Sequence, residues 1–237
     1  MAIDDLPMPV VNFLNIIGIE WPYLNEDTLY DFAKLVREFG QAVEQTHQDA
    51  ADAVNQLSQA HQGASTRQMQ SGWAELSQRH VTEILDACTI VADALEAWAV
   101  YVIAQKGEAL IQFIAMAAEF VADQAASVAT LGIAEAALPL IIEAGQKLGQ
   151  SLIQDLEQYV IGKVVEAALK PFFAKVESLL SGLDWSNTSR TESGAGEAVS
   201  LDPTAARQQI SILRQHAETM VGHAATLKSG LGGLSFG

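Results

Sequence analysis

The residues of this chain that could carry out chemistry are few and lie far apart. His80 and Glu83 are three residues apart, and His216 and His223 are seven apart, so each pair could share one helical face. A defined metal site needs a third or fourth ligand, and neither pair has one nearby. Cys88 is the one cysteine, which is too few thiolates for a cysteine-based zinc site. We therefore predict no metal site and interpret the histidines as solvated.

Sequence motifs for catalysis are also missing. The chain has no G-x-S-x-G, no H-E-x-x-H, no phosphate-binding loop and no dinucleotide fingerprint. Cys88 lies among apolar residues at helical spacing, where a thiol behaves as a small hydrophobic group. We therefore predict a protein that is not an enzyme and needs no cofactor.

Charge and composition narrow the classes of partner. The 237 residues are 49% hydrophobic, which is enough to form a folded core, and 29 acidic residues against 13 basic ones give a net charge of -16. This excess repels nucleic-acid phosphates, and we find no basic patch, so we predict no nucleic-acid partner. Asp4 and Asp5 stand where a secretory signal has basic residues, which predicts no Sec-type signal.

Two long segments carry small and apolar residues at alternating steps of three and four, the pattern of a heptad seam. The first seam is Phe32, Val36, Phe39, Val43, Thr46, Ala50, Ala53, Leu57 and Ala60. The second is Val81, Ile84, Cys88, Val91, Leu95, Trp98 and Val102. Asn25 supplies an N-cap, so the first helix is expected over residues 27–61. Residues 62–72 are small and polar and predict a turn, which makes the two helices an antiparallel hairpin.

Beyond Val102 the apolar positions spread over more than one face of the predicted helix. Charges interrupt residues 97–142 too often for a membrane-spanning stretch, so we expect a helix buried on several sides. Gly132 and Pro139 predict a break, after which another long helix folds back over the second one. Pro171 predicts a kink in that helix and Gly182 its end.

The C-terminal part has a different composition. Residues 186–200 are small, polar and aperiodic, which predicts a flexible linker. Asp202 and Pro203 then mark the start of an amphipathic helix over residues 201–237. We expect this helix to dock on the main body, to self-associate or to await another chain. Its predicted docking strip comprises Ile210, Leu213, Met220, Leu227 and Leu231.

The predicted fold is therefore all-α. Residues 1–26 are expected to be an extended segment and residues 27–185 an elongated helical bundle with long coiled-coil-like helices. The linker and the C-terminal helix, half of a hairpin, complete the chain.

Four consecutive features resemble the WXG-type helical hairpin. They are WPYLNED at residues 21–27, a long helix, HQGASTRQMQSGW at residues 61–73 and a second long helix. In the order of these four features, the chain most resembles the N-terminal domain of polymorphic toxins that actinobacteria export by type VII secretion, including the mycobacterial channel-toxin protein. The resemblance covers residues 15–185, and the tail from Leu201 resembles the start of a second hairpin.

The family motif maps onto the predicted hairpin tip. Gly63 matches the glycine of the Trp-x-Gly turn, and His61 stands where the signature tryptophan would be. Met69 matches a usual large apolar residue, and Trp73 matches a tryptophan ten residues after that glycine. These four residues are the predicted interaction and turn site, although a tight turn and an aromatic closing the tip also explain Gly63 and Trp73.

The resemblance implies a non-catalytic substrate, targeting or adaptor module of a type VII secretion pathway. Its partner would be another helical hairpin, the secretion machinery or a toxin domain, and a homo-oligomer is left open. The protein would be cytoplasmic before export and then secreted or on the cell surface. The alternative is a membrane-active helical protein that forms a channel or pore.

Overall fold

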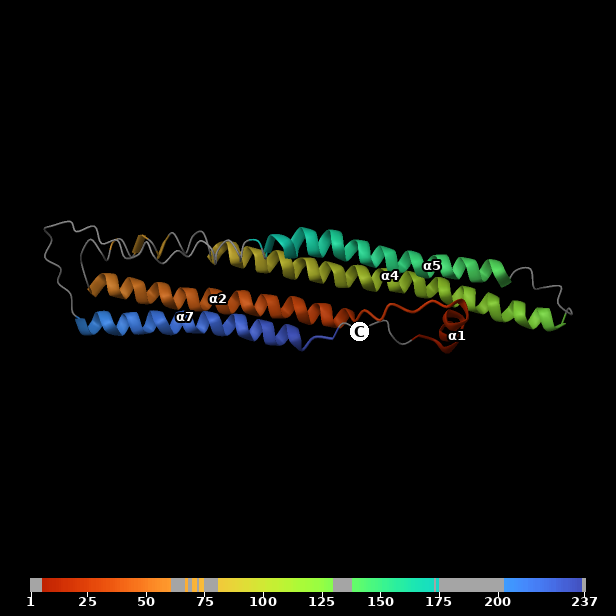
Figure 1. Ribbon diagram of the computed structural model, residues 1–237, viewed down its shortest axis with the longest axis horizontal. Helices are drawn as coiled ribbons and strands as arrows, with labels where there is room; N and C mark the ends of the chain where they lie inside the picture. The colour runs from red at the N-terminus through yellow and green to blue at the C-terminus, as the bar shows by residue number, and fades with distance from the viewer. Residues whose placement is uncertain are drawn as a thin grey trace. The chain divides into compact units, whose positions relative to one another are not determined.

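The described part of the chain is mainly helical. The computed structural model describes residues 6–60, 67, 70–71, 73–74, 81–129, 138–172, 174 and 203–235, and no strand occurs in these ranges. The elements are α1 (Met8–Ile17), α2 (Glu26–Ala60), α4 (Thr82–Ala129), α5 (Leu138–Tyr159), the π-helical stretch η3 (Val160–Leu169) and α7 (Pro203–Gly232) (Figure 1). The predicted all-α fold class is confirmed.

The chain packs as two compact units, each described here by itself. Unit 1 comprises Met1–Asp31, Ala94–Glu166 and Leu234–Gly237. Unit 2 comprises Phe32–Asp93 and Ala167–Gly233. The long helices α2 and α4 therefore each contribute to both units.

In unit 2, α2 and α4 run in opposite directions against each other. A Cβ atom on Gly40 would lie 3.3 Å from Cβ of Cys88, and Arg37 Nη2 donates to Asp93 Oδ1 at 2.7 Å. Residue numbers rise along α4 as they fall along α2, which makes the pair antiparallel. Most members of the two predicted seams are buried in this part of the chain, among them Val36, Val43, Ala50, Ala53, Leu57, Cys88 and Val91. The predicted helical hairpin packing is confirmed for these segments.

The tail helix α7 lies along α2 in unit 2 (Figure 1). Thr46 Oγ1 and His223 Nε2 are 2.8 Å apart, and a Cβ atom on Gly230 would lie 2.9 Å from Cδ2 of Leu35. These contacts also make α7 antiparallel to α2. Of the three arrangements expected for the tail helix, docking on the main body is the one observed, and the helix begins at Pro203 as predicted.

The beginning of α2 has the N-cap that the sequence predicts. Asn25 Oδ1 accepts hydrogen bonds from the backbone N–H groups of Asp27, at 3.0 Å, and Thr28, at 3.3 Å. These bonds satisfy N–H groups that have no partner within the first helical turn. The observed start at Glu26 and end at Ala60 agree with the predicted helix to within one residue at each end.

Unit 1 is built around the side of α4 that α1 covers. Val10, Phe13, Leu14 and Ile17 lie on one face of α1 and are buried. The rings of Phe13 and Phe120 pack with centroids 5.5 Å apart. Gly18 ends α1 in the left-handed conformation, at φ 70°, which turns the chain toward Trp21. The Trp21 ring in turn packs edge-on against Phe113 at 6.3 Å.

The helix α5 runs back along α4 in unit 1, as predicted. The rings of Tyr101 and Tyr159 stack with centroids 4.1 Å apart, and Leu152 and Leu156 join the core that contains Phe113. This helix approaches the N-terminal segment closely as well. A Cβ atom on Gly149 would lie only 2.6 Å from Cγ2 of Ile19, so a glycine is needed at this contact.

Three predictions about local structure are wrong where the chain is described. The predicted extended segment at residues 1–26 contains α1, because Val10, Phe13, Leu14 and Ile17 have helical rather than strand spacing. The predicted turn at residues 62–72 is wrong at Arg67 and at residues 70–71, which are helical.

The third correction concerns the burial of α4. We expected burial on several sides, yet Ile111, Ile114 and Val121 are exposed because the neighbouring helices cover only part of the α4 surface. Several other expectations lie outside the described residues: the rest of the turn, the break at Gly132, the end at Gly182, the linker 186–200 and the cap at Asp202.

Replacing Gly149 should show how tightly unit 1 is packed. In Gly149→Ala, the new methyl group would overlap Ile19, and overpacking of this kind destabilises a fold by about 1–3 kcal/mol. The matched control is Gly222→Ala in α7, where nothing lies within 4 Å and the better helix propensity should stabilise by about 0.5–1 kcal/mol. Urea unfolding followed by circular dichroism measures both changes. Equal stability of the two variants would contradict the close contact.

Candidate interaction surface

Of the residues predicted at the hairpin tip, Trp73 is described, whereas His61, Gly63 and Met69 lie outside the described residues. The Trp73 ring stacks on His47 of α2, with centroids 5.3 Å apart and an angle of 10° between the planes. Burial lowers the pKa of His47 from its usual value of 6.5. Trp73 Nε1 is buried and has no hydrogen-bond partner among the described residues. Trp73 therefore packs against the first helix of the hairpin.

The predicted docking strip on α7 is only partly covered. Ile210 is exposed, and Leu213, Met220, Leu227 and Leu231 are half-buried. His223 and Gly230 of α7 lie against Thr46 and Leu35 of α2. The close approach at Gly230 has a simple physical cause, since the absence of a side chain lets the two helices come together.

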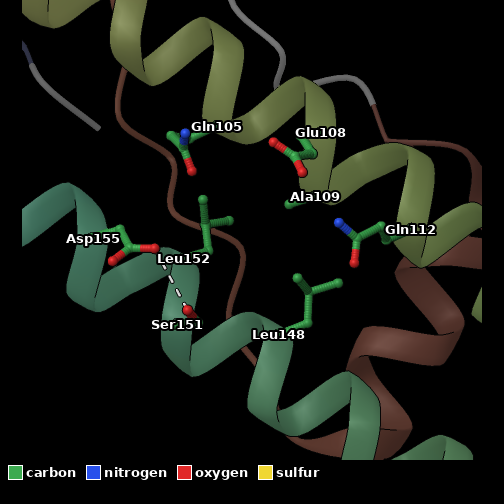
Figure 2. A pocket seen from close by; sticks show the side chains of 8 residues that line it. All are labelled: Gln105, Glu108, Ala109, Gln112, Leu148, Ser151, Leu152 and Asp155. Atoms are coloured by element: carbon green, nitrogen blue, oxygen red, sulfur yellow. Dashed lines mark hydrogen bonds between the residues drawn. The ribbon is translucent and has the colours of Figure 1, made fainter.

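A polar groove lies between α4 and α5 in unit 1 (Figure 2). Its volume is about 170 Å³, and it is open to solvent. Both helices contribute side chains that point into it: Gln105, Glu108, Ala109 and Gln112 from α4, and Leu148, Ser151, Leu152 and Asp155 from α5. Ser151 Oγ donates to Asp155 Oδ2 at 3.5 Å. The groove thus has an apolar floor and polar sides that include two carboxylates.

Beside this groove, α4 presents a second apolar face that our sequence analysis did not separate from the core face. We call it the outer face of α4, and it comprises Ala97, Val100, Ala104, Gly107, Ile111, Ile114, Ala118 and Val121. Val100 is 58% exposed, Ile111 71%, Ile114 45% and Val121 56%. The same alternation of four and three that revealed the two seams is present in these residues, so the sequence did contain a signal for this face.

The core side of α4 holds a buried ion pair. Lys106 and Glu26 are both fully buried, and Lys106 Nζ lies 3.0 Å from Glu26 Oε1. Lys106 Nζ also donates to the carbonyl oxygen of Leu24 at 2.9 Å and lies 5.9 Å from the centroid of the Trp21 ring. Glu26 Oε2 is buried with no hydrogen-bond partner in the described part of the chain. These contacts attach the start of α2 to α4. Because Lys106 and Glu26 are 80 residues apart in the sequence, local spacing patterns do not reveal their pairing.

The chemistry available to these sites is limited. Cys88 is buried, and burial raises its pKa to about 11, so the thiol is protonated and a poor nucleophile at neutral pH. No cluster of three histidine, cysteine, aspartate or glutamate side chains that could hold a metal occurs among the described residues. What the surface offers instead is an apolar helix face next to carboxylates, an arrangement suited to binding another helix.

Comparison with protein families identifies the hairpin. A family model for the WXG100 like domain matches residues 5–144, which is more than half of the chain. The chain belongs to this family. Searches of curated proteins and of solved structures found no match.

The match to the WXG100-like family covers α1, α2, α4 and the first turns of α5. It therefore includes all of α1. The motif resemblance covers residues 15–185 and so leaves out most of this helix. Membership makes this a helical protein related to type VII secretion. Members of the WXG100-like family are generally non-enzymatic and pair as helical hairpins.

The buried ion pair of this WXG100-like domain can be tested by removing one partner. We expect Lys106→Met to destabilise the protein by about 3–5 kcal/mol, because a buried carboxylate would lose its counter-ion. The double variant Glu26→Gln/Lys106→Met should recover most of this loss. Urea unfolding measures both, and Lys147→Met is the control, since its pair with Glu143 is exposed and should contribute little. A single variant as stable as the wild type would show that the pair is not buried.

Protonation of His47 should destabilise the protein in acid. Because burial lowers the pKa of His47, the folded state favours the neutral ring. The stability that comes from keeping the His47 ring neutral is fully present above pH 6.5, the usual pKa of histidine. It is lost as the pH falls below that value through the lowered pKa of the folded state. Unfolding free energies measured across this range should fall less in His47→Gln than in the wild type. The same pH dependence in His47→Gln and in the wild type would contradict this prediction.

Proposed function

We propose that this protein is a non-catalytic substrate or targeting module of a type VII secretion pathway that acts through contacts between helices. The observation that carries the proposal is the antiparallel packing of α2 on α4 within the residues that match the WXG100-like family. An exposed apolar face on α4 supports a role in binding, because contiguous exposed apolar patches mark surfaces that bind other molecules.

A finer proposal places the protein in a polymorphic-toxin system. Its support is the order of sequence features at residues 21–73, which resembles the N-terminal domain of exported toxins. In this proposal residues 27–185 form the helical domain, 186–200 the linker and 201–237 an amphipathic tail helix that is the first half of a second hairpin. The partner is then another hairpin chain, the secretion machinery or a toxin domain supplied by a separate chain.

The proposed route begins in the cytoplasm and ends outside the cell or on its surface. Type VII export of WXG100-like proteins proceeds without a Sec signal peptide. Tight helix packing also suits this proposal, since a protein that acts by presenting helical surfaces needs stable helices rather than a reactive site.

A second candidate function is membrane activity. One helix in the described ranges, Thr82–Asp123, is long and apolar enough to cross a membrane, and 39% of its most apolar window is buried. The core helix of a soluble protein passes the same test. Insertion would also have to break the buried pair of Lys106 with Glu26, which makes it the less favoured of the two candidates.

Export can be tested in a host that has a type VII system. The full chain should accumulate in the culture filtrate of the wild-type host and remain in the cell lysate when the secretion ATPase is deleted. A cytoplasmic marker protein controls for lysis. Unchanged accumulation without the ATPase would contradict the export proposal. Release of a dye from lipid vesicles by the purified protein, together with absence of export, would favour membrane activity instead.

A further inference from the structure

The outer face of α4 has the dimensions and pattern of a surface for a single helix. From Ala97 to Val121 the apolar and small residues follow steps of three and four, and all lie within unit 1. At ~1.5 Å per residue, this face extends about 36 Å along the helix. Ile111 and Ile114 stand near its middle, and both are exposed. An apolar seam of this length matches the a and d positions of a partner helix in a coiled coil.

One edge of this face is acidic. Glu108 belongs to the groove between α4 and α5, where Asp155 contributes a second carboxylate from the facing helix (Figure 2). Glu119 follows Glu108 by eleven residues, which is three helical turns, so it lies on the same edge of α4. Glu108 and Glu119 are exposed, and neither forms an ion pair within the described residues. The apolar face is therefore bordered by carboxylates that form no ion pair in the described part of the chain.

The negative charge of this edge indicates which kind of surface can cover the outer face of α4. In an antiparallel pair of two copies, the acidic edges would lie against each other, and each copy carries a net charge of -16. An anionic membrane would repel the same carboxylates. A helix with lysine or arginine along one edge of its apolar side would instead place cations over the groove and apolar residues over Ile111 and Ile114.

We infer that the outer face of α4 and the adjoining acidic groove bind an amphipathic helix with a basic edge, contributed by a different protein. The apolar seam supplies affinity, while Glu108, Glu119 and Asp155 select the partner and fix its direction. This inference rests on the proposed function, because it specifies the surface and the charge by which the WXG100-like domain would recognise its helical partner.

The inference can be tested with two synthetic helical peptides about four heptads long, which matches the length of the face. Both have the same apolar seam; one carries lysine and the other glutamate along the same edge. Fluorescence anisotropy with the full chain should show binding of the lysine peptide that weakens as salt increases, and much weaker binding of the glutamate peptide.

Two pairs of substitutions locate the binding surface. Ile111→Ser/Ile114→Ser should weaken binding of the lysine peptide about tenfold or more, because it removes two apolar anchors. Glu108→Lys/Glu119→Lys should reverse the preference, so that the glutamate peptide binds better. The controls are Val221→Ser, whose side chain is 71% exposed like that of Ile111, and Glu157→Lys, on the side of α5 away from the groove. Circular dichroism verifies that each variant is folded.

Several results would overturn the inference. Equal binding of both peptides, or equal weakening by the control substitutions, would exclude a specific acidic surface. A dimer in sedimentation equilibrium that Ile111→Ser/Ile114→Ser dissociates would assign the face to a second copy. Preference for vesicles of phosphatidylcholine with phosphatidylglycerol over the lysine peptide, lost in the same variant, would assign it to a lipid surface.

The export assay separates this inference from the proposed function. If the wild-type chain is exported but fails to bind the lysine peptide, the inference about the face is wrong and the export proposal stands. If the chain is not exported but binds the lysine peptide through Ile111 and Ile114, the binding surface is supported and the export proposal fails.

Discussion

The apolar surface of α4 is the constraint on which the rest of unit 1 depends. Its core side must be removed from water, and α1, the Trp21 segment and α5 together cover it with Phe13, Trp21 and Leu152. These neighbours leave the opposite side uncovered, where Ile111 and Val121 are more than half exposed. A helix that is apolar on two sides but covered on one has stability to gain from a further surface, and this links the fold of the WXG100-like domain to its role in binding.

The buried lysine adds specificity to this apolar packing. Leucine side chains tolerate small shifts of one helix along another, whereas Lys106 must meet both Glu26 and the carbonyl of Leu24 to offset the loss of its hydration. The pair therefore fixes where the start of α2 lies along α4. The close contact of Gly149 with Ile19 restricts α5 in a similar way, through shape instead of charge.

Much of the fold could be predicted because periodic patterns are local. The steps of three and four gave the positions of α2 and α4, and Asn25 marked the helix start to within one residue. The N-terminal helix α1 was missed because its ten residues are a short window in which to recognise a helical period. The outer face of α4 was missed for another reason: its apolar residues interleave with those of the core face, and only tertiary packing shows which of the two is covered. The ion pair of Lys106 with Glu26 depends on contacts that no local pattern records.

The hydrogen bond from Thr28 Oγ1 to the carbonyl oxygen of Ser235, 2.7 Å long, joins residues 207 apart in sequence. Both residues belong to unit 1, so this unit is assembled from chain segments made at very different times. At about 5–20 residues per second, a ribosome would make Ser235 roughly 10 to 40 s after Thr28. During translation, the apolar face of α1 must wait for α4 to be synthesised, and the hydrogen bond of Thr28 must wait for Ser235, which follows α7. The nascent chain thus exposes its N-terminal apolar residues to chaperones for seconds before its own helices can cover them.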